Sequence, residues 1–184
     1  MQTLRAHSAC IYQALFSPHH QSTLATCSFD GTLKIFDLRN PFFPSVQAPN
    51  VSGSGQRPAQ AALTVPASVT EILTLDWNKY RPYNIATSGV DKTIKVWDCR
   101  MVRMDGSSEV GGVCEREFRG HEYAVRKLQW SPHRSDLLAS ASYDMTCRVY
   151  VCYSLCTHVG KLITFMLQVV HDPQSTNAFP PAYT

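Results

Sequence analysis

Histidine and aspartate, the usual partners in acid–base catalysis, recur at a fixed spacing along the sequence. The interval from His7 to Asp30 is the same as that from His121 to Asp144, and Asp91 lies in a similar local context. Acid–base catalysis also requires a nucleophile or a polarising group beside such a pair, and the sequence shows no set of this kind. An aspartate in a tight turn commonly accepts hydrogen bonds from its own backbone. We therefore expect these residues to stabilise turns, and we expect the protein not to be an enzyme.

A second group with possible chemistry consists of Cys152, Cys156 and His158, whose side chains are zinc ligands by type. A structural zinc site usually combines two such pairs, and the sequence supplies one. The 7 cysteines lack the spacing of a disulfide framework, and no secretory signal precedes them. We therefore expect reduced thiols, with no bound metal and no cofactor.

The composition excludes several further classes of protein. Of the 184 residues, 44% are hydrophobic and 17% are charged, which is typical of a globular chain. The 17 basic and 14 acidic residues give a formal net charge of +3, which is too small to indicate a nucleic-acid surface. The longest apolar stretch, 162–167, is much shorter than the ~20 residues that a membrane span requires.

Three segments of the chain, 7–38, 68–99 and 121–152, align with one another without gaps. The aligned segments agree at four positions: an aromatic residue, a hydroxyl, an aspartate and a second aromatic residue. In that order the residues are Phe16, Trp77 and Trp130; Thr26, Thr87 and Ser140; Asp30, Asp91 and Asp144; and Phe36, Trp97 and Tyr150. Agreement at this many positions indicates a repeat, and a repeat indicates an array of similar supersecondary units.

Each unit has the pattern of short β-strands. Residues 11–16 form an apolar run rich in β-formers, and 24–28 form a second run with small side chains. Asp30-Gly31 is a tight-turn signal, and 32–36 alternate polar and apolar residues as a half-buried strand does. The sequence therefore predicts an all-β fold.

The repeated units resemble the WD40 repeat, whose marks stand at their ends: Ala6-His7, Gly120-His121 and Trp97-Asp98. The resemblance implies a β-propeller of four-stranded blades. It also implies a buried network in each blade that links a histidine, a strand hydroxyl, the turn aspartate and a closing tryptophan. By position these residues are His7, Thr26 and Asp30 in the first unit, Thr87, Asp91 and Trp97 in the second, and His121, Ser140 and Asp144 in the third. No unit contains all four types.

A narrower resemblance lies in five blocks: Phe16–His19, Glu71–Tyr80, Trp97–Arg100, Gly120–Lys127 and Ser140–Asp144. Together they are similar to the family of peroxisomal import receptors for the type-2 targeting signal. That resemblance implies a cytosolic, non-enzymatic cargo receptor. Its implied partners are proteins bearing the signal, a co-receptor peroxin and peroxisomal docking proteins, with shuttling between the cytoplasm and the peroxisome. Nucleic acid is not among them.

The repeats suggest how the chain is organised. We expect repeats over 1–153, as blades at about 1–40, 67–100 and 118–153. Residues 41–66 are a Pro-, Ser- and Gly-rich insert that predicts a flexible surface loop, and 105–117 predict a shorter polar loop. Residues 154–184 leave the family pattern and show no clear closing strand. Since the receptor family has about seven blades, three blades predict a partial propeller, and we expect a truncated product.

The resemblance also implies a site on one propeller face. The family ligand is an N-terminal nonapeptide with basic and apolar residues on one face of a short helix. The carboxylates of Glu71 and Glu122 suit its basic residue, and Tyr123 or Tyr143 suits its apolar side. The full set of candidate cargo-binding residues is Phe29, Glu71, Val90, Glu122, Tyr123, Arg126 and Tyr143.

Three other hypotheses stay open at this point. One is an enzyme, because propeller hydrolases exist, although the fold alone does not confer a chemistry. The chain could be a WD40 scaffold of another complex, such as a ubiquitin-ligase adaptor or a chromatin subunit, which would share the fold and differ in its face residues. It could also be a truncated product without a function of its own, because an incomplete propeller exposes strand edges.

Overall fold

The computed structural model describes residues 4, 6–39, 61–100, 109–152 and 165–167. Within these ranges every regular element is a strand, so the predicted all-β class is confirmed. In chain order the strands are β1 (Ile11–Phe16), β2 (Thr23–Ser28), β3 (Thr32–Asp37), β4 (Leu63–Pro66), β5 (Ile72–Trp77), β6 (Asn84–Gly89), β7 (Ile94–Asp98), β8 (Glu109–Val110), β9 (Val113–Phe118), β10 (Val125–Trp130), β11 (Leu137–Ser142), β12 (Cys147–Val151) and β13 (Phe165–Leu167).

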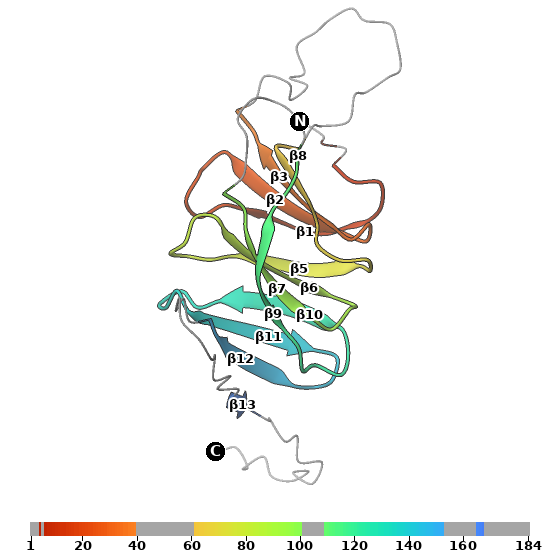
Figure 1. Cartoon of the computed structure of the whole chain (residues 1–184), viewed down its shortest axis with the longest axis vertical. Helices are drawn as coiled ribbons and strands as arrows, with labels where there is room; N and C mark the ends of the chain where they lie inside the picture. Colours follow the sequence, from red (N-terminus) through yellow and green to blue (C-terminus); the bar gives the residue numbers. More distant parts are fainter. Residues whose placement is uncertain (1–3, 5, 40–60, 101–108, 153–164, 168–184) are drawn as a thin grey trace, which may run out of the picture.

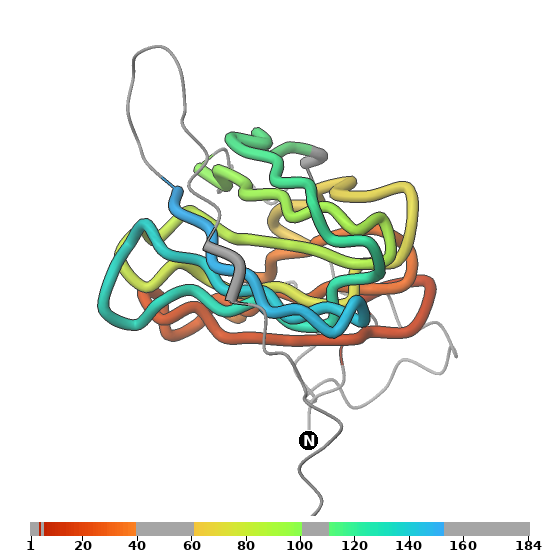
Figure 2. The backbone as a smooth tube through the Cα atoms, turned by 90° about the horizontal axis from the view of Figure 1, so that it is seen from below, coloured from red at the N-terminus to blue at the C-terminus, as the bar shows by residue number. Residues whose placement is uncertain are grey.

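The strands form three sheets, which are the blades of a partial β-propeller as predicted. The first blade has the order β1-β2-β3-β4, extended by β8; the second is β5-β6-β7-β9, and the third is β10-β11-β12-β13. All pairings are antiparallel except β4 with β8. The blades stack in chain order along the long axis of the molecule (Figure 1), and they overlie one another when viewed along the stack (Figure 2). The inner strand β5 contacts both β1 and β10.

Alternating side chains explain the third strand of each blade. In β3, Leu33 and Ile35 are buried, whereas the neighbouring Thr32 and Lys34 are partly exposed. The turn before β3 contains Gly31 with φ 74°, a left-handed conformation that glycine adopts at little cost. The equivalent turns hold Lys92 at φ 65° and Met145 at φ 61°, which carries a steric cost in a residue with a Cβ atom.

Two predictions about loops are wrong, because both loops contain the outer strand of a blade. The segment predicted as the surface loop 41–66 ends in β4, where Leu63 and Val65 are fully buried. The polar loop predicted at 105–117 contains most of β9, in which Phe118 alone is buried. Both strands lack the strong signal of an inner strand: β4 is short and ends in proline, and β9 is charged because its position at the blade edge exposes it. Residues 41–60 and 105–108 lie outside the described residues.

The statement that the tail shows no closing strand is also wrong. Strand β13 (Phe165–Leu167) pairs antiparallel with β12 and so takes the outer position of the third blade. Its three residues are too few for a periodic pattern, which is why the sequence did not predict it. The rest of the tail, 154–164 and 168–184, lies outside the described residues.

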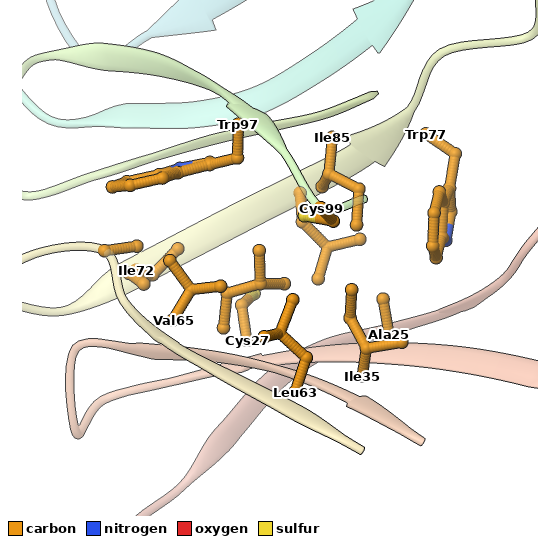
Figure 3. Packing of buried hydrophobic residues seen from close by; sticks show 13 residues of the cluster. Ala25, Cys27, Ile35, Leu63, Val65, Ile72, Trp77, Ile85, Trp97 and Cys99 are labelled. Carbon is orange, nitrogen blue, oxygen red and sulfur yellow. The ribbon is translucent and has the colours of Figure 1, made fainter. Parts of the chain in front are cut away.

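The hydrophobic core lies between the blades. One cluster joins the first and second blades and includes Leu63, Val65, Ile72, Ile85 and Trp97 (Figure 3). A second cluster joins the second and third blades and includes Val96, Phe118, Leu128, Trp130 and Leu138. Burying a large apolar side chain contributes about 1.5–3 kcal/mol. Adhesion between neighbouring blades therefore supplies much of the stability.

Candidate peptide-binding face

Each blade joins the turn before its third strand to the start of its inner strand. The same backbone hydrogen bond occurs three times: Phe29 to Cys10 at 2.9 Å, Val90 to Glu71 at 3.1 Å and Tyr143 to Ala124 at 3.0 Å, with the first residue donating its N–H. Hydrogen bonds between neighbouring inner strands keep these strands in register: Gln13 bonds to Leu75, and Thr74 bonds to Leu128. The three blades consequently present Phe29, Val90 and Tyr143 along the same side of the stack of blades (Figure 1), which we call the turn face.

The turn face carries exposed aromatic and apolar side chains. Tyr123 and Tyr143 are each 60% exposed, Phe29 is 50% exposed and Val90 is 40% exposed. Glu122 and Arg126 are exposed as well. The candidate residues of all three blades therefore lie on the turn face.

Glu71 differs from the other candidates because it has a side-chain partner from another blade. The hydroxyl of Tyr12, on β1, donates a hydrogen bond of 2.6 Å to Glu71 Oε2. This hydrogen bond, more than burial, raises the pKa of Tyr12 above its ordinary value. The sequence analysis missed Tyr12, although an exposed tyrosine at the start of an inner strand is a signal that could have found it.

The inner strands are tied together by side chains that bond to the backbone of the next blade. Gln13 Oε1 accepts hydrogen bonds from Thr74 Oγ1 at 3.1 Å and from the Leu75 N–H at 3.2 Å. Thr74 Oγ1 in turn accepts the Leu128 N–H at 3.1 Å, and Asp76 Oδ2 accepts the Trp130 N–H at 2.7 Å. These contacts fix the register between blades, and the register fixes the layout of the turn face.

Two blades contain a complete histidine bridge. In the first, His7 Nε2 lies 2.7 Å from Thr26 Oγ1, and His7 Nδ1 lies 3.0 Å from Asp30 Oδ2. In the third, His121 Nε2 lies 2.6 Å from Ser140 Oγ, and His121 Nδ1 lies 2.7 Å from Asp144 Oδ2. A carboxylate only accepts hydrogen bonds, so Nδ1–H donates and Nε2 accepts the hydroxyl when the histidine is neutral.

The second blade makes the same connection with different residues. Ser68 stands in the histidine position and donates to Asp91 Oδ2 at 3.0 Å, while Lys95 Nζ lies 3.3 Å from the same oxygen. Trp97 Nε1 donates to Thr87 Oγ1 at 2.8 Å. Eight of the nine residues of the implied network thus contact one another within their own blades, in pairs or bridges and never as a full set of four. The ninth, Asp91, bonds instead to Ser68 and Lys95.

The histidine bridges shift the pKa values of their members. Burial opposes the ionisation of Asp30, but hydrogen bonds from Thr32 and His7 outweigh it and lower the pKa of Asp30 to about 2. The same balance, with hydrogen bonds from Thr146 and His121, lowers the pKa of Asp144 well below its usual range. Burial also lowers the pKa of His7 from its ordinary value of 6.5, although Asp30 acts in the opposite direction.

The free energy of unfolding is expected to fall as the pH is lowered from about 6.5 to about 3. The unfolded chain binds protons at Asp30, Asp144 and His7 more readily than the folded chain does, so acid favours unfolding at all three groups. Urea denaturation followed by circular dichroism at several pH values measures this slope. Asp30→Asn removes one carboxylate and should make the slope shallower below about pH 4, where Asp30 titrates in the unfolded chain. A free energy that does not change with pH over this range would contradict the expectation.

The part of the chain that the structure describes contains no group of three or more potential metal ligands. Cys156 and His158, which formed the possible zinc pattern with Cys152, lie outside it. Burial raises the pKa of the Cys152 thiol to about 12. The described residues also include no helix with the length and hydropathy needed to cross a bilayer.

Comparison with known proteins agrees with this architecture. The sequence model of the WD40 family (WD domain, G-beta repeat) matches residues 1–37, 62–98 and 112–150. The chain is 40% identical over 151 residues to the peroxisomal targeting signal 2 receptor of Saccharomyces cerevisiae, a match that covers 77% of this chain and 36% of that protein. It is 38% identical over 143 residues to the receptor of the same name from Komagataella phaffii, covering 77% of this chain and 33% of that protein.

A more distant match is to coronin-7 from Bos taurus, which is 30% identical over 123 residues and covers 67% of this chain and 12% of that protein. The chain thus spans about a third of the length of the two receptors it matches. The family match reaches all three blades and includes β4 and β9, the outer strands of the first two, but not β13 of the third. The chain therefore belongs to the WD40 repeat family.

Proposed function

We propose that this chain binds proteins carrying a type-2 peroxisomal targeting signal, as the cargo-binding part of an import receptor. The observation that carries the proposal is the similarity to proteins named peroxisomal targeting signal 2 receptor, at 40% identity in Saccharomyces cerevisiae and 34% in Mus musculus. Since the chain spans about a third of those proteins, the proposal concerns recognition of the signal and not every activity of a receptor.

The turn face supports the proposal through its chemistry. On the turn face, Glu71 and Glu122 supply carboxylates, and Tyr123 and Tyr143 supply exposed aromatic surface. A short helix with a basic residue and apolar residues on one side needs both kinds of contact. The arrangement therefore fits capture of such a helix across neighbouring blades.

The proposed role is non-enzymatic. A receptor of this kind would work with a co-receptor peroxin and with docking proteins at the peroxisome, and would move between the cytoplasm and that organelle. The histidine–aspartate bridges support the absence of catalysis, because the side chains of His7 and His121 are fully buried and face partners within their own blades.

Replacing Glu71 by glutamine is expected to weaken binding of a type-2 signal peptide about tenfold. The change removes the negative charge that would pair with the basic residue of the peptide, and a charge-assisted hydrogen bond contributes about 1.5–3 kcal/mol. Fluorescence anisotropy with a labelled nonapeptide and the purified 184-residue chain measures the dissociation constant. The matched control is Glu115→Gln on β9, whose carboxylate accepts a hydrogen bond of 2.7 Å from Asn84 Nδ2 at the end of the second blade away from the turn before β7.

The outcomes separate the hypotheses. Binding that is weakened about tenfold in Glu71→Gln and unchanged in Glu115→Gln supports the proposal. A chain that melts cooperatively in circular dichroism but does not bind the peptide would overturn it. A chain that neither melts cooperatively nor binds would support the alternative of a truncated product without its own function.

The second candidate is a WD40 scaffold of another complex. The similarity to coronin-7 favours it, because 67% of this chain aligns at 30% identity with a protein that is not named as a targeting signal receptor. Such a scaffold would retain the blades and use other residues of the turn face. A folded chain that does not bind the signal peptide but binds a defined protein subunit would favour this candidate.

A further inference from the structure

Tyr12 and Glu71 form a side-chain contact that bridges the first two blades. The Tyr12 hydroxyl donates to Glu71 Oε2 at 2.6 Å, and the two residues lie on the neighbouring inner-strand regions. We propose that Tyr12 is a positioning residue, whose hydroxyl holds the Glu71 carboxylate in the orientation that accepts the cation of a bound signal peptide. This inference rests on the proposed function and assigns a specificity role to a residue of the first blade.

The backbone of Glu71 is held within its own blade. Its carbonyl oxygen accepts the Val90 N–H at 3.1 Å. Gly89 packs so closely against it that a Cβ atom on Gly89 would lie 1.9 Å from the Glu71 oxygen. The main chain of Glu71 therefore has a defined place, and the freedom that remains is the rotation of its side chain.

Tyr12 removes that remaining freedom before a ligand arrives. A free glutamate side chain loses conformational entropy when it is ordered. When another part of the protein orders it beforehand, the cost does not reduce the affinity for the ligand. The tyrosine hydroxyl supplies a single donor, so it engages Oε2 and leaves Oε1 available to a cation.

The register between the blades keeps the tyrosine in place. Gln13, the residue after Tyr12, accepts hydrogen bonds from Thr74 Oγ1 at 3.1 Å and from the Leu75 N–H at 3.2 Å. These two bonds lock β1 against β5 next to the Tyr12–Glu71 pair. Tyr12 therefore reaches Glu71 because the inner strands are in register and not through a chance approach of surface side chains.

A neighbouring cation makes a fixed carboxylate useful. As the weakest of several effects, the positive charge of Arg126, on β10, lowers the pKa of the Tyr12 hydroxyl. The positive charge of Arg126 would repel the basic residue of an incoming peptide. A carboxylate held at one position on the side of the first blade can still direct that residue, whereas a freely rotating one would spread its attraction over many orientations.

The test compares Tyr12→Phe with the unaltered 184-residue chain, using two peptides. One is the signal nonapeptide, and the other has its basic residue replaced by norleucine. Tyr12→Phe should weaken binding of the basic peptide about fivefold and leave binding of the norleucine peptide unchanged. In the Glu71→Gln background the same substitution should have no further effect. Tyr83→Phe, at the opposite end of the second blade, is the matched control.

The possible results distinguish this inference from the function on which it rests. Equal weakening of both peptides would mean that Tyr12 acts only on the structure, and would overturn its positioning role. Unchanged binding in Tyr12→Phe, with binding lost in Glu71→Gln, would also overturn it while leaving the proposed function intact. If the unaltered chain binds neither peptide, the proposed function fails first. Thermal melting of each variant verifies that the fold is retained.

Discussion

Trp130→Ala is expected to destabilise the chain by about 3–5 kcal/mol, the range found when a buried tryptophan is truncated in a core. Trp130 is 2% exposed and belongs to the cluster that joins the second and third blades. Its removal would leave a cavity beside Leu128 and Leu138, which the rigid sheets could fill only in part. Urea denaturation monitored by tryptophan fluorescence and by circular dichroism measures the change.

The repeat supplies a control at the equivalent position. Phe16 of the first blade aligns with Trp130, but it is 63% exposed. Phe16→Ala should therefore change the free energy of unfolding by less than about 1 kcal/mol, because little apolar surface is lost from the core. Similar losses in the two variants would contradict the assignment of the core to the interfaces between blades.

His121→Ala should be the second most damaging change, with a loss of about 3 kcal/mol. The substitution removes the partner of Asp144 Oδ2 at 2.7 Å and that of Ser140 Oγ at 2.6 Å. The Asp144 side chain is 5% exposed, so its negative charge would remain buried with fewer donors. Chemical denaturation gives the free energy, and amide hydrogen exchange shows whether the loss is concentrated in the third blade.

Two further variants make this prediction specific. His133→Ala changes an exposed loop histidine and should be nearly neutral. His121→Ala combined with Asp144→Ala should cost less than the sum of the single changes, since the double variant no longer buries an unpaired charge. If the losses in the free energy of unfolding add up, His121 and Asp144 contribute to stability independently, which would contradict the prediction.

The sequence predicted the first three strands of each blade because their signals are local and repeated. An apolar inner strand, a small-residue second strand and an alternating third strand recur around the turn residues Asp30, Asp91 and Asp144. The outer strands were missed for two reasons: β4 alternates buried and more exposed side chains over only four residues, and β9 is exposed at every position but Phe118. An outer strand is identified by its pairing with the neighbouring strand of the blade. A local sequence pattern carries no information about that pairing.

The candidate site shows the same division. The turn positions Phe29, Val90 and Tyr143 could be placed on one face from the repeat alone, because equivalent positions of stacked units lie at the same end. The contact between Tyr12 and Glu71 could not, because those residues occupy different positions in their units. Their meeting depends on the stagger between two inner strands, which Gln13 and Thr74 set through bonds to the backbone.

The position of β4 has a consequence for how the chain can be divided. By sequence β4 belongs to the matched segment 62–98, yet it pairs with β3 of the blade before; β9 has the same relation to 112–150 and the second blade. A fragment cut at the boundaries of the sequence repeats would therefore begin with a strand that has lost its pairing partner, and the preceding blade would lack its outer strand. Fragments for expression should be cut just after Pro66 or Phe118 instead. For the same reason, unravelling of one repeat would strip a strand from the preceding blade, so the two should melt together.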